Sequence, residues 1–328
     1  MAVDVGQLLA GLDRGERRAL ARLLTVVEDG RPEQLREIVA ATYPRTGRAR
    51  VIGVTGSPGV GKSTLTDAIA GALRARERSV AVLAVDPSSP FSGGALLGDR
   101  VRMQGHHADP DVFIRSMASR GHLGGLSFAT PQAVLLLDAA GFDDVVVETV
   151  GVGQSEVEVA ATADITLVAI APGMGDSVQA AKAGILEVAD VFVINKADHP
   201  GAGKLESELR GMLEMGHATA GEDDEPGWWP PILRTVAVRA EGIPQLMDEL
   251  ERHASFLADS GEGDRRVRAR AVHTIREIAL EQLRLRFARL DVGDDPLLEA
   301  LASKVANRDL DPYTAADEVL AALEGGEA

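Results

Sequence analysis

The sequence predicts an α/β fold in which helices flank a central, mostly parallel β-sheet. Between about residues 49 and 260, short runs of β-branched, apolar residues alternate with segments of helical patterning. Most of these runs end in Gly, Asp or Asn. Such strands are typical of a sheet covered on both faces, and ligand sites in these folds collect at the carboxyl ends of the strands.

Six segments carry the strand pattern. In chain order they are RVIGVTG, SVAVLAVD, DDVVVETVG, ADITLVAIAPG, ADVFVINKAD and ILRTVAV. Their β-branched residues favour extended backbone, and helical segments lie between them. We therefore expect residues 49–260 to form the domain that contains the sheet.

Helical extensions are predicted at both ends, over residues 1–48 and 261–328. In the first, leucines recur at three- and four-residue spacing, and Pro32 stands where a further helix can begin. In the second, DRRVRARAVHTIREIALEQLRLRFARL forms one long helical pattern, with Val272, Ile275, Ile278, Ala279 and Leu283 on one side. This pattern carries eight arginines. Two interpretations stay open for it: a solvated, mixed-charge face, or an arm used in self-association.

Composition argues against several kinds of partner and location. The formal net charge of −16 disfavours nucleic acid and anionic membrane surfaces. The chain has no cysteine, which excludes disulfides and thiolate metal sites. No apolar stretch approaches the roughly 18–20 residues of a membrane span, and the start shows no secretory signal pattern. We expect a cytoplasmic protein without nucleic-acid or membrane partners.

A phosphate-binding loop is predicted after the first strand. GSPGVGKS fits G-x-x-x-x-G-K-[ST] and has the strand–loop–helix context that this motif requires. Its glycines let backbone N–H groups approach the phosphates, and the helix N-terminus adds its dipole. We expect Lys62 to neutralise the β- and γ-phosphate oxygens and Ser63 to bind Mg²⁺ through its hydroxyl. The residues expected around the phosphates are Gly56, Ser57, Pro58, Gly59, Val60, Gly61, Lys62, Ser63 and Thr64.

A base-recognition motif, NKAD, ends the fifth predicted strand and comprises residues 195–198. The carboxylate of Asp198 can accept hydrogen bonds from the ring N–H and the 2-amino group of guanine, whereas adenine presents neither donor. Lys196 can lie along the base plane with its aliphatic stem, and Asn195 completes the motif. Behind a phosphate loop, this motif indicates GTP and GDP as ligands.

Glu148 ends the third predicted strand, within VVVETVGVGQSE. We expect it to reach Mg²⁺ or a Mg²⁺-bound water with its long side chain, and Gly151 to offer its N–H to the γ-phosphate. Because Mg²⁺ prefers several oxygen ligands, Asp86 and Asp99 in VDPSSPFSGGALLGDR are further candidates. For Asp99, a solvated loop acid is the alternative. The Ser/Gly/Pro-rich composition of this stretch predicts a switch loop.

Hydrolysis needs a residue that orients the attacking water. Gln154 is the nearest candidate after Gly151, and Glu156 is the next. Because neither follows the glycine directly, we expect hydrolysis to be slow until a partner rearranges the loops.

These segments together resemble one known family. GSPGVGKST, VDPSSPFSGGALLGDRVRM, VVVETVGVGQSE, PGMGDSVQAAKAGILEVADVFVINKAD and DPYTAADEVL are similar to strings of the methylmalonyl-CoA mutase-associated GTPases, the MeaB-type chaperones, and the resemblance spans nearly the whole chain. It implies a P-loop GTPase with helical N- and C-terminal extensions, a homodimer, GTP and Mg²⁺. It also implies a role in loading, protecting and reactivating an adenosylcobalamin-dependent mutase.

The resemblance implies further site residues. A loop at about residues 171–182 is expected to rearrange with the nucleotide, and Lys182 lies where the family has a lysine linked to this change. The family's Ser-Ala motif near the guanine corresponds to TVAVRAEG, in which Ala237 replaces the serine and Val238 the alanine. Backbone contacts from Val236, Ala237 and Val238 survive this change, but a serine side-chain contact does not. Ser57 stands where related ATPases carry a second lysine, so a dimer closed around the nucleotides is not expected.

Two other functions remain as alternatives. A nickel-delivering metallochaperone GTPase needs His or Cys clusters, and here only His106 and His107 are adjacent. A kinase acting on a transport protein matches older names of the family, but the guanine-directed Asp198 argues against an ATP enzyme. The client also stays open between methylmalonyl-CoA mutase and related acyl-CoA mutases.

Overall fold

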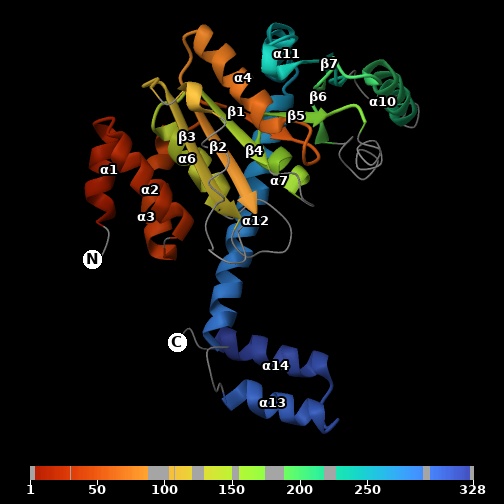
Figure 1. The fold of residues 1–328 in the computed structure, drawn as a ribbon. Helices are drawn as coiled ribbons and strands as arrows, with labels where there is room; N and C mark the ends of the chain where they lie inside the picture. The colour runs from red at the N-terminus through yellow and green to blue at the C-terminus, as the bar shows by residue number, and fades with distance from the viewer. Residues whose placement is uncertain are drawn as a thin grey trace. The chain divides into compact units, whose positions relative to one another are not determined.

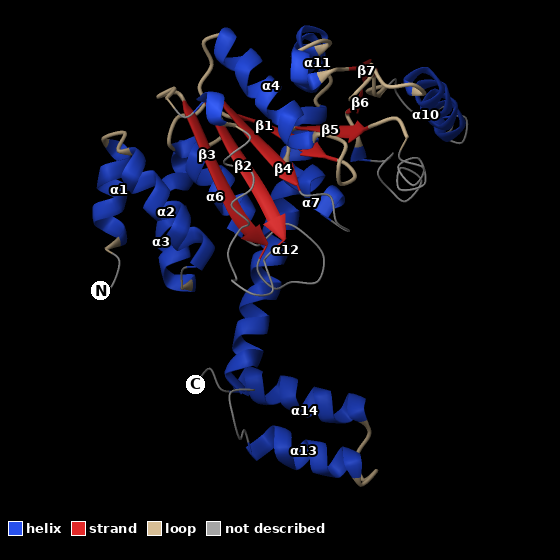
Figure 2. Ribbon diagram, in the orientation of Figure 1, coloured by secondary structure: helices blue, strands red, loops and turns tan. Residues whose placement is uncertain are grey.

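The computed structural model describes most of the chain. The described residues are 4–29, 31–87, 103–106, 108–119, 129–149, 155–173, 188–217, 227–290 and 296–325. The chain divides into two compact units, Met1–Val267 and Arg268–Ala328. The first contains a β-sheet flanked by helices, as Figures 1 and 2 show.

The sheet confirms the predicted α/β fold. Its order is β3-β2-β4-β1-β5-β6-β7, and all the paired neighbours run parallel. The strands are β1 (Arg50–Thr55), β2 (Val80–Pro87), β3 (Val112–Ser119), β4 (Asp144–Thr149), β5 (Ile165–Ile170), β6 (Val191–Ile194) and β7 (Ile232–Arg234). Each predicted strand segment overlaps one of them, with β2 running one residue further, to Pro87, whereas β3 was not predicted.

Alternate residues of each strand supply two different cores. In β4, Val145 and Val147 pack into one hydrophobic cluster, and Val146 packs into another. The first cluster includes residues of α1 (Val5–Asp13), α2 (Arg17–Asp29), α3 (Pro32–Thr42), α6 (Ala129–Ala139) and α7 (Ser155–Thr162). The second includes residues of α4 (Lys62–Ala75) and α11 (Ile243–Asp259). The sheet is therefore covered on both faces, which explains why its strands are continuously apolar.

The two outer strands are covered or short. β3 lies at one edge, where Arg17 of α2 donates to the carbonyl oxygen of Pro110 at 3.3 Å. Glu28 of the same helix forms an ion pair of 2.8 Å with Arg115 of β3. At the other edge, β7 has only three residues, and α10 (Ala202–His217) packs near it. The cover that α2 provides for β3 and the short length of β7 both limit the pairing of an edge strand with another chain.

The second unit is helical. α12 (Glu262–Leu290) begins in the first unit and continues into the second, which confirms the predicted long helix. α13 (Pro296–Ala306) and α14 (Pro312–Gly325) pack together through Leu301, Ala315 and Val319. Among the described residues, no helix is long and apolar enough to cross a membrane.

Candidate nucleotide-binding site

The phosphate loop lies between β1 and α4, at the carboxyl edge of the sheet. Gly56 has φ 135°, and a Cβ atom at this position would lie 2.0 Å from the carbonyl oxygen of Ala169. Only glycine fits there, because β5 passes directly behind the loop. Gly61 also has positive φ and precedes α4, so the first turn of this helix begins directly at the loop.

Lys62 is buried within this loop, with an exposed fraction of 6%. Its Nζ donates to the carbonyl oxygens of Gly56 at 2.7 Å and Ser57 at 3.1 Å. The loop backbone therefore holds the ammonium group against the first two residues of the phosphate loop. An ammonium group placed there can compensate the charge of phosphate oxygens.

Ser63 and Glu148 lie together beside the loop. The hydroxyl of Ser63 donates to Oε1 of Glu148 at 2.6 Å, and only 4% of Glu148 is exposed. The register explains the contact, because β1 and β4 are neighbours and Val54 pairs with Glu148. A hydroxyl and a carboxylate are oxygen donors of the kind that Mg²⁺ prefers, so this pair fits a Mg²⁺ site.

The other proposed metal ligands are described only in part. Asp86 belongs to β2, next to β4, so its backbone stands at the same edge of the sheet; its side chain lies outside the described part. Asp99 lies outside the described residues, as do Gly151, Gln154 and Lys182. Within the described part of the chain, no group of three or more His, Cys, Asp or Glu side chains could hold a metal ion.

One member of the histidine pair is described. His106 Nε2 lies 3.5 Å from Oδ1 of Asp67 on α4. His107 falls outside the described residues. The pair therefore stays untested as a metal site.

Asn195 joins three loops at the end of β6. Its Nδ2 donates to the carbonyl oxygen of Val60 in the phosphate loop at 3.0 Å. Its Oδ1 accepts from Thr235 Oγ1 at 3.2 Å and from the N–H of Ala237 at 3.1 Å. Only 2% of Asn195 is exposed. Its side chain fixes the loop that carries NKAD, residues 195–198, here called the base loop, against the phosphate loop and the segment after β7.

The neighbouring residues Lys196 and Asp198 belong to the predicted base-recognition motif. Lys196 donates from Nζ to the carbonyl oxygen of Gly59 at 2.7 Å, so its stem runs toward the phosphate loop. Asp198 is partly exposed and forms an ion pair of 3.2 Å with Arg239. Val238, in the loop after β7, is 77% exposed. An exposed carboxylate can accept hydrogen bonds from a flat ring with two N–H donors.

Sequence reasoning missed two groups at this site. One is Arg239, which lies in the loop after β7, contacts Asp198 and also pairs with Glu241. The other is the buried hydroxyl pair Thr149 and Thr55, in which Thr149 Oγ1 donates to Thr55 Oγ1 at 3.0 Å. Their only signal in the sequence is proximity to the two predicted motifs.

Known proteins similar to this chain point to one family. A family model described as methylmalonyl Co-A mutase-associated GTPase MeaB matches residues 20–290. A relative from Pyrococcus abyssi, which bears a GTPase name, is 46% identical over 326 residues, and these cover 98% of each chain. The mitochondrial methylmalonic aciduria type A homolog of Caenorhabditis elegans is 34% identical over 280 residues, covering 80% of this chain and 69% of its own. A crystal structure of an LAO/AO transport system kinase superposes with a TM-score of 0.70 and 30% identity, covering 99% of this chain and 100% of that one.

Proposed function

This chain belongs to the methylmalonyl-CoA mutase-associated GTPases, and from that premise we propose that it is a GTP-hydrolysing chaperone of an adenosylcobalamin-dependent acyl-CoA mutase. Methylmalonyl-CoA mutase is the first candidate client. The main support for nucleotide binding is the Asn195 side chain, which joins the phosphate loop to the base loop. The family description and the name of the nematode relative support the client part.

The site residues divide the work of phosphoryl transfer. Lys62, held in the loop, compensates charge on the phosphate oxygens, and the N–H groups of the first turn of α4 orient them. Ser63 and Glu148 are the residues that would hold Mg²⁺, which supplies further charge compensation when bound. Gln154 is proposed to orient water, and Gly151 to contact the γ-phosphate.

Guanine selectivity is assigned to Asp198. Its carboxylate is exposed in the same loop as Asn195 and Lys196, both of which contact the phosphate loop. GTP and ATP share their phosphates and ribose, so selection must come from the base edge. This assignment also argues against the transport kinase function that the similar solved structure carries in its name, because we expect such an enzyme to use ATP.

Binding of nucleotides tests this assignment directly. By calorimetry, the wild type should bind GDP and GTP far more tightly than ATP. Asp198→Asn should weaken GTP binding and favour xanthosine triphosphate, because the amide donates to the 2-oxo group. The matched control is Asp248→Asn, because Asp248 is an exposed acid of α11 that pairs with Arg76. Unchanged GTP affinity in Asp198→Asn would remove this residue from the base site.

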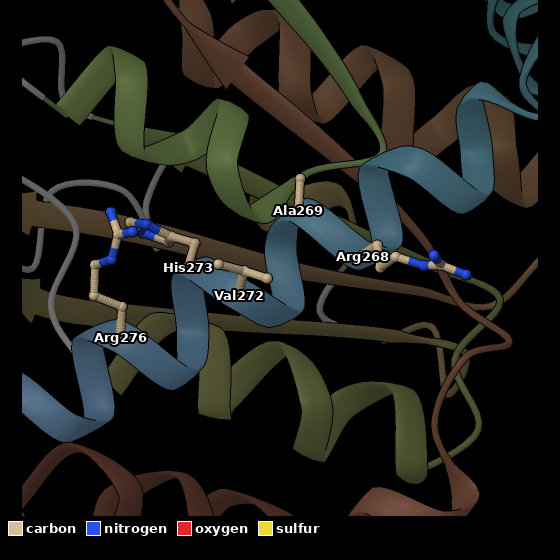
Figure 3. Close-up of a pocket in the computed structure, with 5 residues that line it drawn as sticks. All are labelled: Arg268, Ala269, Val272, His273 and Arg276. Atoms are coloured by element: carbon tan, nitrogen blue, oxygen red, sulfur yellow. The ribbon is translucent and has the colours of Figure 1, made fainter.

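Self-association is proposed for residues 261–328. Val272, Ile275 and Leu283 of α12 are exposed in the single chain. A pocket on this helix is lined by Arg268, Ala269, Val272, His273 and Arg276, which Figure 3 labels. Exposed apolar side chains beside arginines are typical of interfaces between chains. A homodimer through this region is therefore part of the proposal. We also propose that the protein acts in the cytoplasm.

The chaperone role is tested by hydrolysis with and without the mutase. The mutase should accelerate GTP hydrolysis by the wild type. Lys182→Ala should leave the basal rate nearly intact and reduce this acceleration, whereas Lys204→Ala, an exposed lysine of α10, should change neither. Equal stimulation of wild type and Lys182→Ala would assign client sensing to another loop. No stimulation of the wild type would contradict the proposed client.

A further inference from the structure

The loop after β7 folds back toward the base loop. Val236 and Glu241 form an antiparallel bridge, in which the N–H of Val236 donates to the carbonyl oxygen of Glu241 at 3.0 Å. Gly242 closes the turn with φ 76°, and a Cβ atom there would lie 2.1 Å from the carbonyl oxygen of Arg234. The turn is thus fixed at both ends, and Arg239 lies inside it.

Arg239 contacts two carboxylates at once. Its Nε donates to Oε1 of Glu241 at 2.6 Å and its Nη2 to Oε2 at 3.3 Å. Its Nη1 donates to Oδ2 of Asp198 at 3.2 Å. The planar guanidinium group is therefore oriented by Glu241 on one edge while it presents a donor to Asp198 on the other.

The contact leaves the carboxylate of Asp198 able to bind a base. An ionised carboxylate has about four acceptor sites, and Arg239 uses one of them. The ring N–H and 2-amino group of guanine require two more. A carboxylate already held by Arg239 loses less rotational freedom when guanine binds, so binding is more favourable.

Arg239 also separates two like charges. The hydrogen bond from Arg239 lowers the pKa of Glu241, while the nearby Asp198 acts in the opposite direction. The same two acids raise the pKa of Arg239. Without this arginine, the repulsion between the two carboxylates would no longer be compensated.

We propose that Arg239, clamped by Glu241, is a positioning residue that holds Asp198 in the orientation guanine requires. This inference rests on the proposed function, because it assumes that Asp198 binds the base. Arg239 then sets the affinity for GDP and GTP without touching the phosphates. Exposed ion pairs contribute little free energy, so the expected effect on affinity is about twofold to fivefold.

The test measures GDP affinity by calorimetry in the whole protein. Arg239→Ala should bind GDP about twofold to fivefold more weakly than the wild type, and Glu241→Gln should be weakened in the same direction by a smaller factor. Arg234→Ala is the matched control, because Arg234 forms a similarly exposed pair with Glu206 at 2.6 Å and does not contact Asp198. It should bind GDP as the wild type does. Melting temperatures of all variants check that the fold is intact.

A second background separates positioning from general loop stability. In Asp198→Asn protein, xanthosine diphosphate replaces GDP as the ligand. Adding Arg239→Ala to this variant should weaken xanthosine diphosphate binding clearly less than Arg239→Ala alone weakens GDP binding. Equal losses in both backgrounds would overturn the proposal, as would wild-type or tighter GDP binding by Arg239→Ala. If Glu241→Gln binds GDP as tightly as the wild type, Glu241 does not orient Arg239. If Asp198→Asn itself binds GDP normally, the proposed base site fails instead, so the two failures are distinguishable.

Discussion

The hydroxyl of Ser63 donates a hydrogen bond of 2.6 Å to Oε1 of Glu148, a residue 85 positions further along the chain. The contact arises because β1, which leads into the phosphate loop, lies beside β4, which ends at Thr149. The long side chain of Glu148 spans the distance from the strand end to the first turn of α4. A shorter acid at this position would leave its carboxylate further from Ser63.

We predict that Glu148→Gln slows GTP hydrolysis roughly 100-fold, because it removes a charged oxygen donor from the proposed metal site while keeping its shape. GDP affinity measured without Mg²⁺ should stay near that of the wild type, since the base contacts are unchanged. Ser63→Ala should act in the same direction. Glu251→Gln, whose acid pairs with Arg50 at the amino end of β1, is the control. Normal Mg²⁺-dependent turnover in Glu148→Gln would reduce this residue to a strand-end acid.

Asn195→Ala should lower both stability and nucleotide affinity. The change removes the donor to Val60 and the acceptor for Ala237 N–H, both of which are buried. Each buried polar group left without its partner costs about 1–3 kcal/mol. Thermal unfolding and GDP calorimetry measure the two effects, with the exposed Asn307→Ala as the control. Loss of GDP affinity without any fall in melting temperature would contradict the idea that Asn195 joins the loops.

Most of the sheet could be predicted because its strands are apolar on both faces. β3 was missed because Arg115 interrupts its apolar pattern. Phe113 and Met117 on either side are buried in the core, whereas Arg115 pairs with Glu28 from a helix 87 residues away. A charged residue inside a strand is tolerated when another element supplies its partner, and sequence spacing does not reveal such a partner.

The site shows the same division between local and distant information. The phosphate loop and NKAD were predictable because each is a contiguous segment whose chemistry depends on neighbouring residues. The contact between Arg239 and Asp198 joins residues 41 positions apart, on two different loops. It depends on the pairing of β6 with β7, and no short motif encodes that pairing.

Ala240→Gly should stabilise the protein. Ala240 has φ 55°, in the left-handed region that a Cβ atom makes unfavourable. Glycine adopts this conformation without the steric cost, so we expect a gain of up to about 1 kcal/mol in the free energy of unfolding. Ala258→Gly, in the exposed part of α11, should have the opposite sign because its backbone is helical. Chemical denaturation measures both, and destabilisation by Ala240→Gly would refute the strain at this turn.

Asp190 should make stability depend on pH in the acid range. It precedes β6, and 8% of its side chain is exposed. Its Oδ2 accepts from the N–H of Thr166 at 2.8 Å, and its Oδ1 accepts from Arg266 at 2.9 Å. His253 Nε2 lies 3.3 Å from the same Oδ1. Burial opposes ionisation, but the hydrogen bonds and charges of His253 and Arg266 outweigh it, so the pKa of Asp190 lies below its ordinary value of 3.8.

A lowered pKa in the folded state means that ionised Asp190 stabilises the fold above pH 3.8 and that this contribution is lost as pH falls through the folded-state pKa. Asp190→Asn should therefore lower the free energy of unfolding by roughly 2–3 kcal/mol near neutral pH, because it leaves Arg266 and His253 without their anionic partner. The difference from the wild type should narrow once the pH falls below 3.8. Trp228, whose Nε1 donates to the carbonyl oxygen of Asp190 at 2.7 Å, reports local unfolding by fluorescence during denaturation. The control is Asp264→Asn, which changes an exposed acid at the start of α12 and should show neither effect. If the difference in unfolding free energy between wild type and Asp190→Asn stays constant with pH, the charge of Asp190 does not contribute to stability.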